Sequence, residues 1–295
     1  AWPRAQGSAL AMAATGASAE LGEFRAGATF DAEGFGAALA AFLRPLCLEC
    51  SPPFLAGWHN RLREETAGGL QPIEAADPVV AFALYSVPGY LDVVVEHFAR
   101  KGPEKDFVDS CTNEILDLIR ERLHPDLEPL LVNTDAGPPY YHVQSIGAVA
   151  GVDQHLEASD LRSEGDDEWR EDLSDRLEDT RDPKMWGTDP VMRRKIFGVN
   201  VHPTWGGWYA YRALLVLRGA QAEAVRRPTS LSFVTPDDAR RVLLEYNLRH
   251  EQCRWRDLSA DGHPPDKRYT PDEYLFFMET SSAKRKRYLE IRGAR

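Results

Sequence analysis

The chain has 295 residues, of which 43% are hydrophobic and 27% charged, as is ordinary for a globular protein with a buried core. Its formal net charge of -11 disfavours a nucleic-acid binder, which would carry a basic surplus. No apolar run reaches the roughly 18 residues of a membrane helix. Only four cysteines in so long a chain indicate a reducing compartment, so we expect a cytoplasmic protein without a membrane partner.

The beginning of the chain differs in composition from the rest. Residues 1–29 contain much Ala, Gly and Ser, with no acidic residue before Glu20. A transit peptide can look like this, but only Arg4 and Arg25 precede residue 30, so we expect a disordered tail. No Gly/Ser-rich linker follows, which predicts one α+β domain over residues 30–295.

Helical and strand-like segments alternate in the first half of this domain. Apolar residues recur at helical spacing in some segments, whereas others are short runs of strand-forming residues. These patterns predict helices at 30–46, 54–62, 90–100 and 107–123, and strands at 79–85 and 130–132.

Two segments in the middle of the chain have unusual compositions. Residues 143–156 are apolar and rich in small residues, which allow close packing against a neighbouring element or a flat ligand. Residues 164–182 hold ten acidic residues and three arginines without a periodic apolar face. A charge run of this kind predicts a solvated surface insert that can be deleted, rather than a metal site.

The second half begins with a predicted β-hairpin. Strands at 195–201 and 208–217 flank a turn in which Gly206 and Gly207 permit positive φ angles. Thr235 and Thr270 are each followed by Pro and acidic residues, the typical start of a helix. Helices are therefore expected at 235–250, 270–278 and 283–291.

Several common catalytic motifs are absent from the sequence. It contains no G-x-S-x-G, P-loop, G-x-G-x-x-G or H-E-x-x-H pattern. Cys47 and Cys50 form a lone C-x-x-C, which without a second such pair indicates two ordinary thiols rather than a zinc ribbon. Arg212 lies among apolar residues, where a guanidinium needs an anion or a hydrogen-bonded partner; a structural ion pair is the commoner case.

One long segment carries a resemblance to a known family. Residues 196–219, I-F-G-V-N-V-H-P-T-W-G-G-W-Y-A-Y-R-A-L-L-V-L-R-G, resemble the core of the cobalamin-processing family of the methylmalonic aciduria and homocystinuria type C protein. That family shows G-V-x-x-H-P-x-x-G-G-W-x-A-x-R there. Supporting pieces follow the family's order from about residue 45 to 290, at 79–88, 149–151, 182–187, 243–247, 255–257, 268–273 and 283–285.

The resemblance implies a fold like that of flavin-dependent nitroreductases, with a mixed or antiparallel sheet and packed helices. It implies that cobalamin binds with its lower base displaced from cobalt. Cyanide is then removed reductively, by reduced FMN or FAD supplied with NADPH, and alkyl groups are transferred to the thiol of glutathione. Family members pass cobalamin to an adaptor protein and then to methionine synthase or methylmalonyl-CoA mutase.

The resemblance also assigns binding residues. The family's glutathione-binding arginines correspond to Arg212, Arg256 and Arg285; the third placement needs one inserted residue, with Lys284 as the alternative. No catalytic side chain is expected, because glutathione supplies the thiolate. The residues expected to contact cobalamin are Gly147, Ala148, Gly151, His155, Gly198, Val199, Asn200, Gly206, Gly207 and Tyr269.

Three positions depart from the family's vertebrate pattern. Ala148 replaces a histidine, Asn200 a cysteine and Cys253 a tryptophan. Ala148 argues against a histidine–cobalt bond from that position. His155 could reach the site instead, although a lone histidine is more often structural. Two other functions stay open: a nitroreductase-type flavoenzyme that does not bind cobalamin, and a non-catalytic cobalamin carrier.

Overall fold

The computed structural model describes residues 10, 21–27, 29–65, 71–75, 78–102, 106–133, 141–186, 188–222, 224–260, 265–279 and 281–293. The chain divides into two compact units, which are described separately: unit 1 comprises 1–151, 209–229 and 268–295, and unit 2 comprises 152–208 and 230–267. The single domain expected over 30–295 stays a prediction. Of the expected tail, residues 1–9 and 11–20 lie outside the described residues, while Leu21–Glu23 form a short 3-10 helix, η1.

Unit 1 is built on an antiparallel sheet. Its strand order is β1-β3-β7-β4, and β2 also pairs with β3; the bounds are β1 Leu48–Cys50, β2 Phe54–Leu55, β3 Val79–Ser86, β4 Pro129–Asn133 and β7 Ala210–Gln221. The two longest strands, β3 and β7, lie at the centre with Ala81 opposite Val216. A central strand is covered on both faces, which explains why every residue of β3 is buried.

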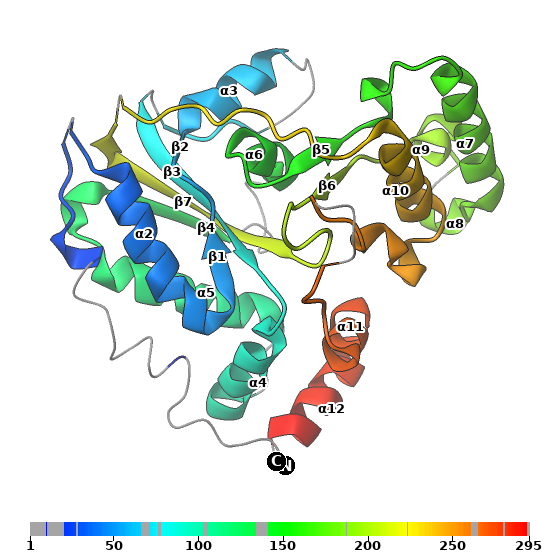
Figure 1. The fold of residues 1–295 in the computed structure, drawn as a ribbon. Coiled ribbons are helices and arrows are strands. Elements are labelled where there is room, and N and C mark those ends of the chain that lie inside the picture. Colours follow the sequence, from blue (N-terminus) through cyan, green and yellow to red (C-terminus); the bar gives the residue numbers. More distant parts are fainter. Residues whose placement is uncertain are drawn as a thin grey trace. The chain divides into compact units, whose positions relative to one another are not determined.

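Helices cover both faces of this sheet (Figure 1). In that view α3 and α6 lie above the strands, and α2, α4 and α5 lie below them. Phe35 of α2 packs on Phe82 of β3 with their ring centroids 5.4 Å apart. The helices of unit 1 are α2 Ala32–Leu43, α3 Ala56–Glu65, α4 Tyr90–Lys101, α5 Phe107–Arg122, α6 Val143–Val149, α11 Pro271–Met278 and α12 Ser282–Gly293, with 3-10 helices η2 Arg44–Leu46 and η3 Pro125–Leu127.

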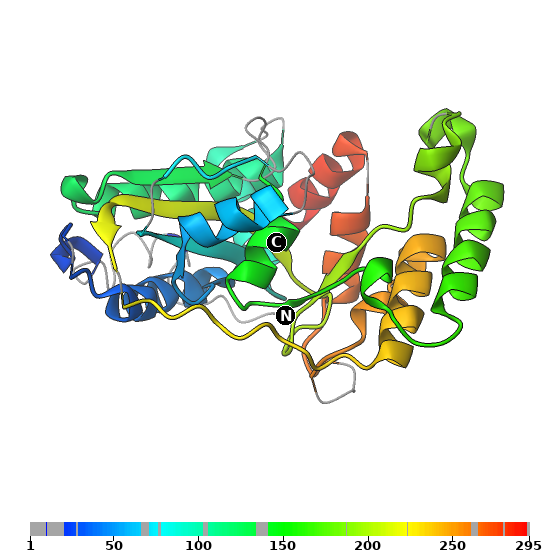
Figure 2. The ribbon, with the colours of Figure 1, turned by 90° about the horizontal axis from the view of Figure 1, so that it is seen from above.

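Unit 2 combines a two-stranded sheet with a group of helices (Figures 1 and 2). Strand β5 (Gln154–Leu156) pairs antiparallel with β6 (Val199–Val201). Buried side chains from both strands join Val242, Leu243 and Trp255 in one apolar cluster. The helices are α7 Asp166–Thr180, α8 Pro183–Trp186, α9 Pro190–Arg194 and α10 Pro236–Leu248, with 3-10 helices η4 Ala158–Asp160, η5 His250–Gln252 and η6 Arg254–Arg256.

The predicted α+β class with antiparallel sheets and packed helices is confirmed. The two helices predicted to begin at Thr235 and Thr270 are also confirmed. Thr235 accepts a hydrogen bond from the Asp238 amide, and Thr270 forms a capping box with Glu273. Within the described residues, every helix is too short or too polar to cross a bilayer.

The predicted hairpin is wrong. Its first strand, β6, pairs with β5, whereas its second strand, β7, pairs with β3 and β4 in the other sheet. The turn between them closes on itself, since His202 and Gly206 exchange backbone hydrogen bonds of 2.8 and 2.9 Å. The long apolar run of β7 suits a strand that is paired on both edges, by β3 and β4, in a sheet whose two faces are covered, which a two-stranded hairpin could not provide.

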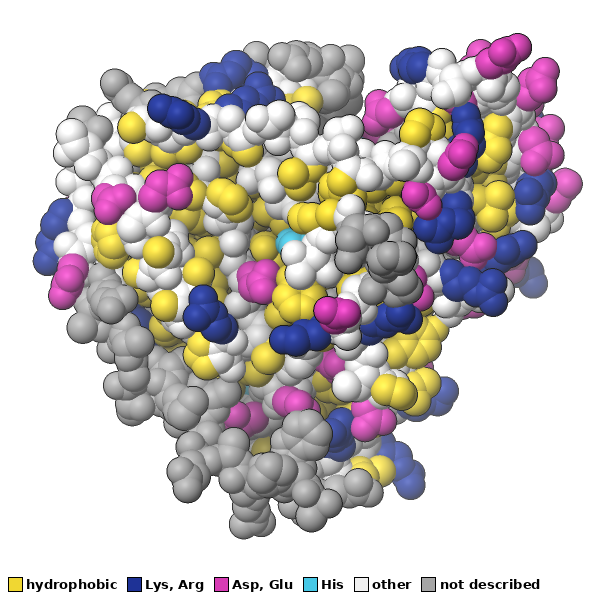
Figure 3. Space-filling model, in the orientation of Figure 1, with side chains coloured by type: hydrophobic (Ala, Val, Ile, Leu, Met, Phe, Trp, Pro, Cys, Tyr) yellow, Lys and Arg dark blue, Asp and Glu magenta, His cyan; other side chains and the backbone are white. Residues whose placement is uncertain are grey.

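The expectation that residues 164–182 lack an apolar face is also wrong. They form α7, and Leu173 and Leu177, four residues apart, are 1% and 0% exposed. Trp169, one turn before Leu173, packs against the apolar cluster of unit 2. The acidic side chains gather on the outer side of this helix, as Figure 3 shows, so the insert is anchored by a narrow apolar stripe.

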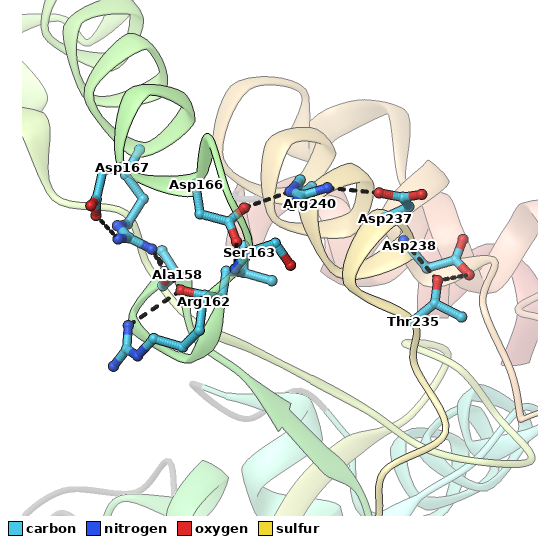
Figure 4. Close-up of polar contacts among 11 residues, drawn as sticks. Ala158, Arg162, Ser163, Asp166, Asp167, Thr235, Asp237, Asp238 and Arg240 are labelled. Atoms are coloured by element: carbon cyan, nitrogen blue, oxygen red, sulfur yellow. Dashed lines mark hydrogen bonds and ion pairs between the residues drawn. The ribbon is translucent and has the colours of Figure 1, made fainter.

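Polar contacts hold the first turn of α7 against α10 (Figure 4). The buried carboxylate of Asp166 accepts hydrogen bonds of 2.6 Å from the Ser163 amide and 2.6 Å from Nε of Arg240. The Arg240 guanidinium, with smaller help from the Ser163 amide, holds the pKa of Asp166 below its ordinary value. Asp166 therefore stays ionised at neutral pH and links the two helices.

Candidate functional site

Three of the predicted binding residues meet at Phe277 in unit 1. The guanidinium carbon of Arg212, on β7, lies 5.6 Å from the centroid of the Phe277 ring. The Tyr269 ring lies 5.2 Å from the same ring, and Nη2 of Arg285 lies 3.5 Å from the Phe277 carbonyl oxygen. Sequence reasoning missed Phe277, because nothing in Y-L-F-F distinguishes it from the fully buried Phe276.

Arg212 is oriented by a hydroxyl group and by aromatic faces. Its Nε donates a 2.9 Å hydrogen bond to Oγ of Ser86, and its guanidinium lies 5.4 Å from the centroid of the Tyr90 ring. Burial raises the pKa of Tyr90 well above 10, so this ring is a neutral partner for the cation. The Arg212 side chain is 8% exposed, which makes it part of the packing of unit 1.

Arg285 lies in the first turn of α12, and its side chain reaches the C-terminal end of α11. Its Nε donates a 2.5 Å hydrogen bond to the Glu279 carbonyl, where a cation also interacts favourably with the helix dipole. The alternative residue, Lys284, pairs instead with the Glu279 carboxylate at 3.2 Å. Of the two candidates, Arg285 is therefore the one that shares contacts with the Phe277 group.

Arg256 lies in unit 2, between two tryptophans. Its guanidinium carbon is 4.2 Å from the Trp255 ring centroid and 5.6 Å from that of Trp208. Its Nη1 donates to the Gly207 carbonyl, while the Gly207 amide donates a 3.0 Å hydrogen bond to the Arg256 carbonyl. The motifs W-R-D and G-G-W, almost fifty residues apart, therefore form one cluster.

Gly206 and Gly207 are required by contacts inside the protein. Gly206 has φ +57°, and a Cβ there would lie 2.3 Å from the Arg256 carbonyl oxygen and 2.6 Å from that of Leu258. A Cβ on Gly207 would lie 2.6 Å from the Trp255 ring. These contacts within the protein are enough to require glycine at both positions, whether or not a ligand binds there. The expected contact of Gly206 and Gly207 with cobalamin stays a prediction.

We expect the substitution Gly206→Ala to destabilise unit 2 strongly. The positive φ alone costs about 1–2 kcal/mol for alanine, and the new methyl group also displaces the backbone at residues 256–258. Gly165→Ala is the matched control, because Gly165 has φ +86° but nothing within 4 Å of its Cβ position. Thermal unfolding should show a much larger loss for Gly206→Ala; equal losses would contradict the packing argument.

His202 stabilises the turn before these glycines. Its Nδ1 accepts hydrogen bonds from the amides of Thr204 at 3.0 Å and Trp205 at 3.1 Å. Burial lowers the pKa of His202 to about 4, so the ring is neutral at physiological pH and can accept both. The histidine of the H-P motif therefore has a structural role that sequence reasoning did not assign.

A second group of predicted residues meets between β5 and β6 in unit 2. His155 lies opposite Asn200 in the strand pair, and its Nδ1 is 2.6 Å from Oδ1 of Asn200. A Cβ on Gly198 would lie 2.8 Å from Cε1 of His155. Val199, which is 3% exposed, faces the apolar cluster and leaves only its backbone for a ligand.

Residues 143–151 of the predicted small-residue segment form α6 and the turn after it, in unit 1. Gly147 is buried, Ala148 is half-buried, and Gly151 has φ +70°. A Cβ on Gly151 would lie 2.7 Å from Cβ of Pro228. Close packing within the protein therefore accounts for Gly151, and the contact of this segment with a flat ligand stays a prediction.

Described residues of unit 2 line at least two pockets. One, of about 450 Å³, adjoins the His202 turn and is lined by Pro203, Thr204, Trp205, Ser259, Ala260, Pro265, Asp266 and Lys267. The other, of about 520 Å³, is lined by Arg181, Phe197, Tyr246, Asn247 and His250. Among the described residues, no three His, Cys, Asp or Glu side chains lie close enough together to hold a metal ion.

The four cysteines are free thiols. Burial raises the pKa of Cys50 and of Cys111 to about 12, so neither forms a thiolate at neutral pH. This supports the interpretation of the C-x-x-C as ordinary thiols.

Comparisons with known proteins agree with these motifs. A family model described as the methylmalonic aciduria and homocystinuria type C family matches residues 48–289, which include all the predicted binding residues. A Gallus gallus protein named cyanocobalamin reductase / alkylcobalamin dealkylase is 26% identical over 248 residues, covering 81% of this chain and 89% of that protein. A Bos taurus protein of the same name is 28% identical over 233 residues, covering 76% and 71%.

A solved structure shows the same fold. It is the crystal structure of a C. elegans B12-trafficking protein, CblC, described as a homologue of human MMACHC. The two chains superpose with a TM-score of 0.56 at 20% identity, covering 82% of this chain and 88% of the other.

Proposed function

Because the chain belongs to the methylmalonic aciduria and homocystinuria type C family, we propose that it binds cobalamin and removes the upper axial ligand of the cobalt. The family match over residues 48–289 carries this proposal, and the names of the vertebrate relatives support it. The same proposal includes a nitroreductase-like architecture and a cytoplasmic location. It also includes transfer of cobalamin to an adaptor protein and then to a B12-dependent enzyme.

Cobalamin binds with its lower base displaced. Loss of that base leaves cobalt with fewer electron-donating ligands, so the metal is easier to reduce and releases cyanide more readily. Reduced FMN or FAD, regenerated with NADPH, supplies the electrons when it is bound. The Ala148 side chain cannot coordinate cobalt, which agrees with binding without a protein ligand at that position.

Dealkylation transfers the alkyl group to the thiolate of glutathione. The Co–C bond breaks as the S–C bond forms, and the electron pair of the Co–C bond stays on cobalt. Positioning the thiolate in line with the Co–C bond is the main contribution that a protein can make to this step. Arg212, Arg256 and Arg285 hold the two carboxylates of glutathione, and their charge raises the thiolate fraction nearby.

Two observations support this use of the arginines. Each guanidinium lies within 6 Å of an aromatic ring centroid, at 5.6 Å from Phe277 for Arg212, 4.2 Å from Trp255 for Arg256 and 5.7 Å from Phe276 for Arg285. Such packing fixes the planar group before the ligand arrives. Arg212 and Arg285 also share contacts with Phe277.

The proposal is tested by absorption spectroscopy and by turnover. Adding the protein to methylcobalamin should convert its spectrum to the base-off form, and adding glutathione should then consume methylcobalamin. A spectrum that stays base-on at saturating protein would contradict cobalamin binding and favour the nitroreductase-type alternative. Base-off binding without turnover, and without decyanation by reduced flavin, would instead indicate a carrier.

A further inference from the structure

The buried carboxyl group of Glu273 connects the starts of two helices in unit 1. Its Oε2 accepts a 2.9 Å hydrogen bond from the amide of Thr270, the N-cap residue of its own helix, α11. Its Oε1 accepts a 2.6 Å hydrogen bond from the amide of Gly89, the N-cap residue of α4, which lies 184 residues earlier in the chain. Glu273 is 3% exposed, so water competes little for either contact.

The contact with Gly89 supplies a cap that α4 does not provide for itself. In a capping box, a side chain three residues after the N-cap accepts a hydrogen bond from the N-cap amide, as Glu273 does in α11. The residue at that position of α4 is Asp92, whose side chain is 61% exposed and lies 3.9 Å from Arg292. Glu273 therefore acts as the capping glutamate of both helices and joins their first turns.

These two helices carry aromatic rings that flank Arg212. The guanidinium carbon lies 5.4 Å from the ring centroid of Tyr90, the first residue of α4, and 5.6 Å from that of Phe277 in α11. Tyr90 directly follows Gly89, and Phe277 lies one turn after Glu273. Because aromatic packing fixes the plane of a guanidinium, the spacing between α4 and α11 determines how Arg212 is held.

The C-terminal end of α11 holds a second arginine. Nε of Arg285 donates a 2.5 Å hydrogen bond to the Glu279 carbonyl, and its Nη2 lies 3.5 Å from the Phe277 carbonyl oxygen. A displacement of α11 would move Phe277 and the Arg285 contacts together, because the helix has eight residues and is internally hydrogen-bonded. One buried contact at the start of α11 therefore affects two of the arginines that are assigned to glutathione.

We propose that Glu273 is a positioning residue for glutathione. By joining α4 to α11 it sets the spacing of Tyr90 and Phe277, and so orients the Arg212 guanidinium for a carboxylate of the ligand. Glu273 acts through Arg212 and not by direct contact, since it is buried and both its oxygens already accept hydrogen bonds from backbone amides. This inference rests on the proposed function and deepens it.

The substitution Glu273→Gln breaks this connection with almost no change of shape. A glutamine side chain has one oxygen, so its NH₂ group must face the amide of either Gly89 or Thr270, donor against donor. Thr270→Ala is the matched control. It removes the hydroxyl group that caps α11 and so destabilises the same helix, but it leaves both contacts of the Glu273 carboxyl group in place.

The first test needs no ligand. Nitrogen-15 NMR of the full chain follows the Nε–H group of Arg212, which donates to Oγ of Ser86 and lies between the two rings. Glu273→Gln should shift this resonance and speed its hydrogen exchange, whereas Thr270→Ala should leave both unchanged. Glu273→Asp is the second variant, for use if Glu273→Gln does not fold, because its carboxyl group is one methylene too short to reach both amides. An unchanged Arg212 resonance in either folded variant would overturn the inference.

The second test measures glutathione-dependent dealkylation of methylcobalamin. Glu273→Gln should raise the KM for glutathione about 10-fold with little change in kcat, because a misplaced guanidinium weakens binding of the ligand's carboxylate. Decyanation by reduced flavin, which uses no thiol, should match the wild type. A merely structural role would instead lower both activities of Glu273→Gln and Thr270→Ala in proportion to their loss of stability, and that result would also contradict the inference.

The two tests separate this inference from the proposed function. If the Arg212 resonance responds to Glu273→Gln but the wild-type protein does not consume methylcobalamin with glutathione, the proposed function is wrong, and so is the role of Glu273 in glutathione binding. If the wild-type protein is active and Glu273→Gln keeps the same KM for glutathione, the proposed function stands and Glu273 does not position the ligand.

Discussion

Replacing Arg256 with alanine is expected to lower glutathione-dependent dealkylation of methylcobalamin about 10- to 150-fold, because a charged hydrogen bond contributes about 1.5–3 kcal/mol. Flavin-dependent decyanation of cyanocobalamin should fall far less, since it uses no thiol. Both rates are measured on the same preparation, with thermal unfolding alongside. Arg256 is a sharper test than Arg212, which is packed against Ser86, Tyr90 and Phe277 and contributes to folding.

Two further variants control this experiment. Arg254→Ala removes an exposed charge from the same 3-10 helix and should leave both activities unchanged. Arg256→Lys keeps the charge but loses the planar fork, so its dealkylation rate should be intermediate. Equal loss of both activities in a folded Arg256→Ala protein would refute the glutathione assignment and favour a structural role through Trp255 and Gly207.

Deleting residues 164–182 is expected to prevent folding, contrary to what the charge pattern of the segment predicts. The deletion removes Leu173 and Leu177, both essentially inaccessible to solvent. It also removes Arg181, whose Nη1 donates to the carbonyls of Met192, Arg193 and Lys195 at 3.1, 2.8 and 2.7 Å. We expect a joined Ser163–Pro183 chain to accumulate as insoluble protein.

Point substitutions in α7 separate its buried stripe from its charged surface. Leu177→Ala should cost about 2–5 kcal/mol of unfolding free energy, because the leucine leaves a cavity in a packed interior. Asp179→Ala, at an exposed position of the same helix, should change stability by less than about 0.5 kcal/mol. Denaturant unfolding measures both. Similar effects for the two variants, or a soluble and folded deletion, would show that the stripe does not stabilise unit 2.

The sequence by itself determined the elements that depend on local chemistry. The helices that begin after Thr235 and Thr270 are specified by an N-cap threonine and the residues within four positions of it. Helices α4 and α5 are specified by the helical spacing of apolar residues within each segment. The apolar run at 79–85 predicted a buried strand without knowledge of its partners, and β3 is buried along its whole length. The family resemblance likewise needed only the order of the motifs.

Strand pairing and the contacts between distant segments were decided only by the tertiary structure. Both flanks of the His202 turn read as strands, yet β6 finds its partner 45 residues earlier in β5, and no local signal encodes such a distant pairing. The buried stripe of α7 was hidden because two leucines at i and i+4 suffice to anchor a helix whose other faces are charged. The contacts of Phe277 with Arg212 and of Asp153 with Asn200 could not be predicted from the sequence. These residues lie far apart along the chain, and only the fold brings them together.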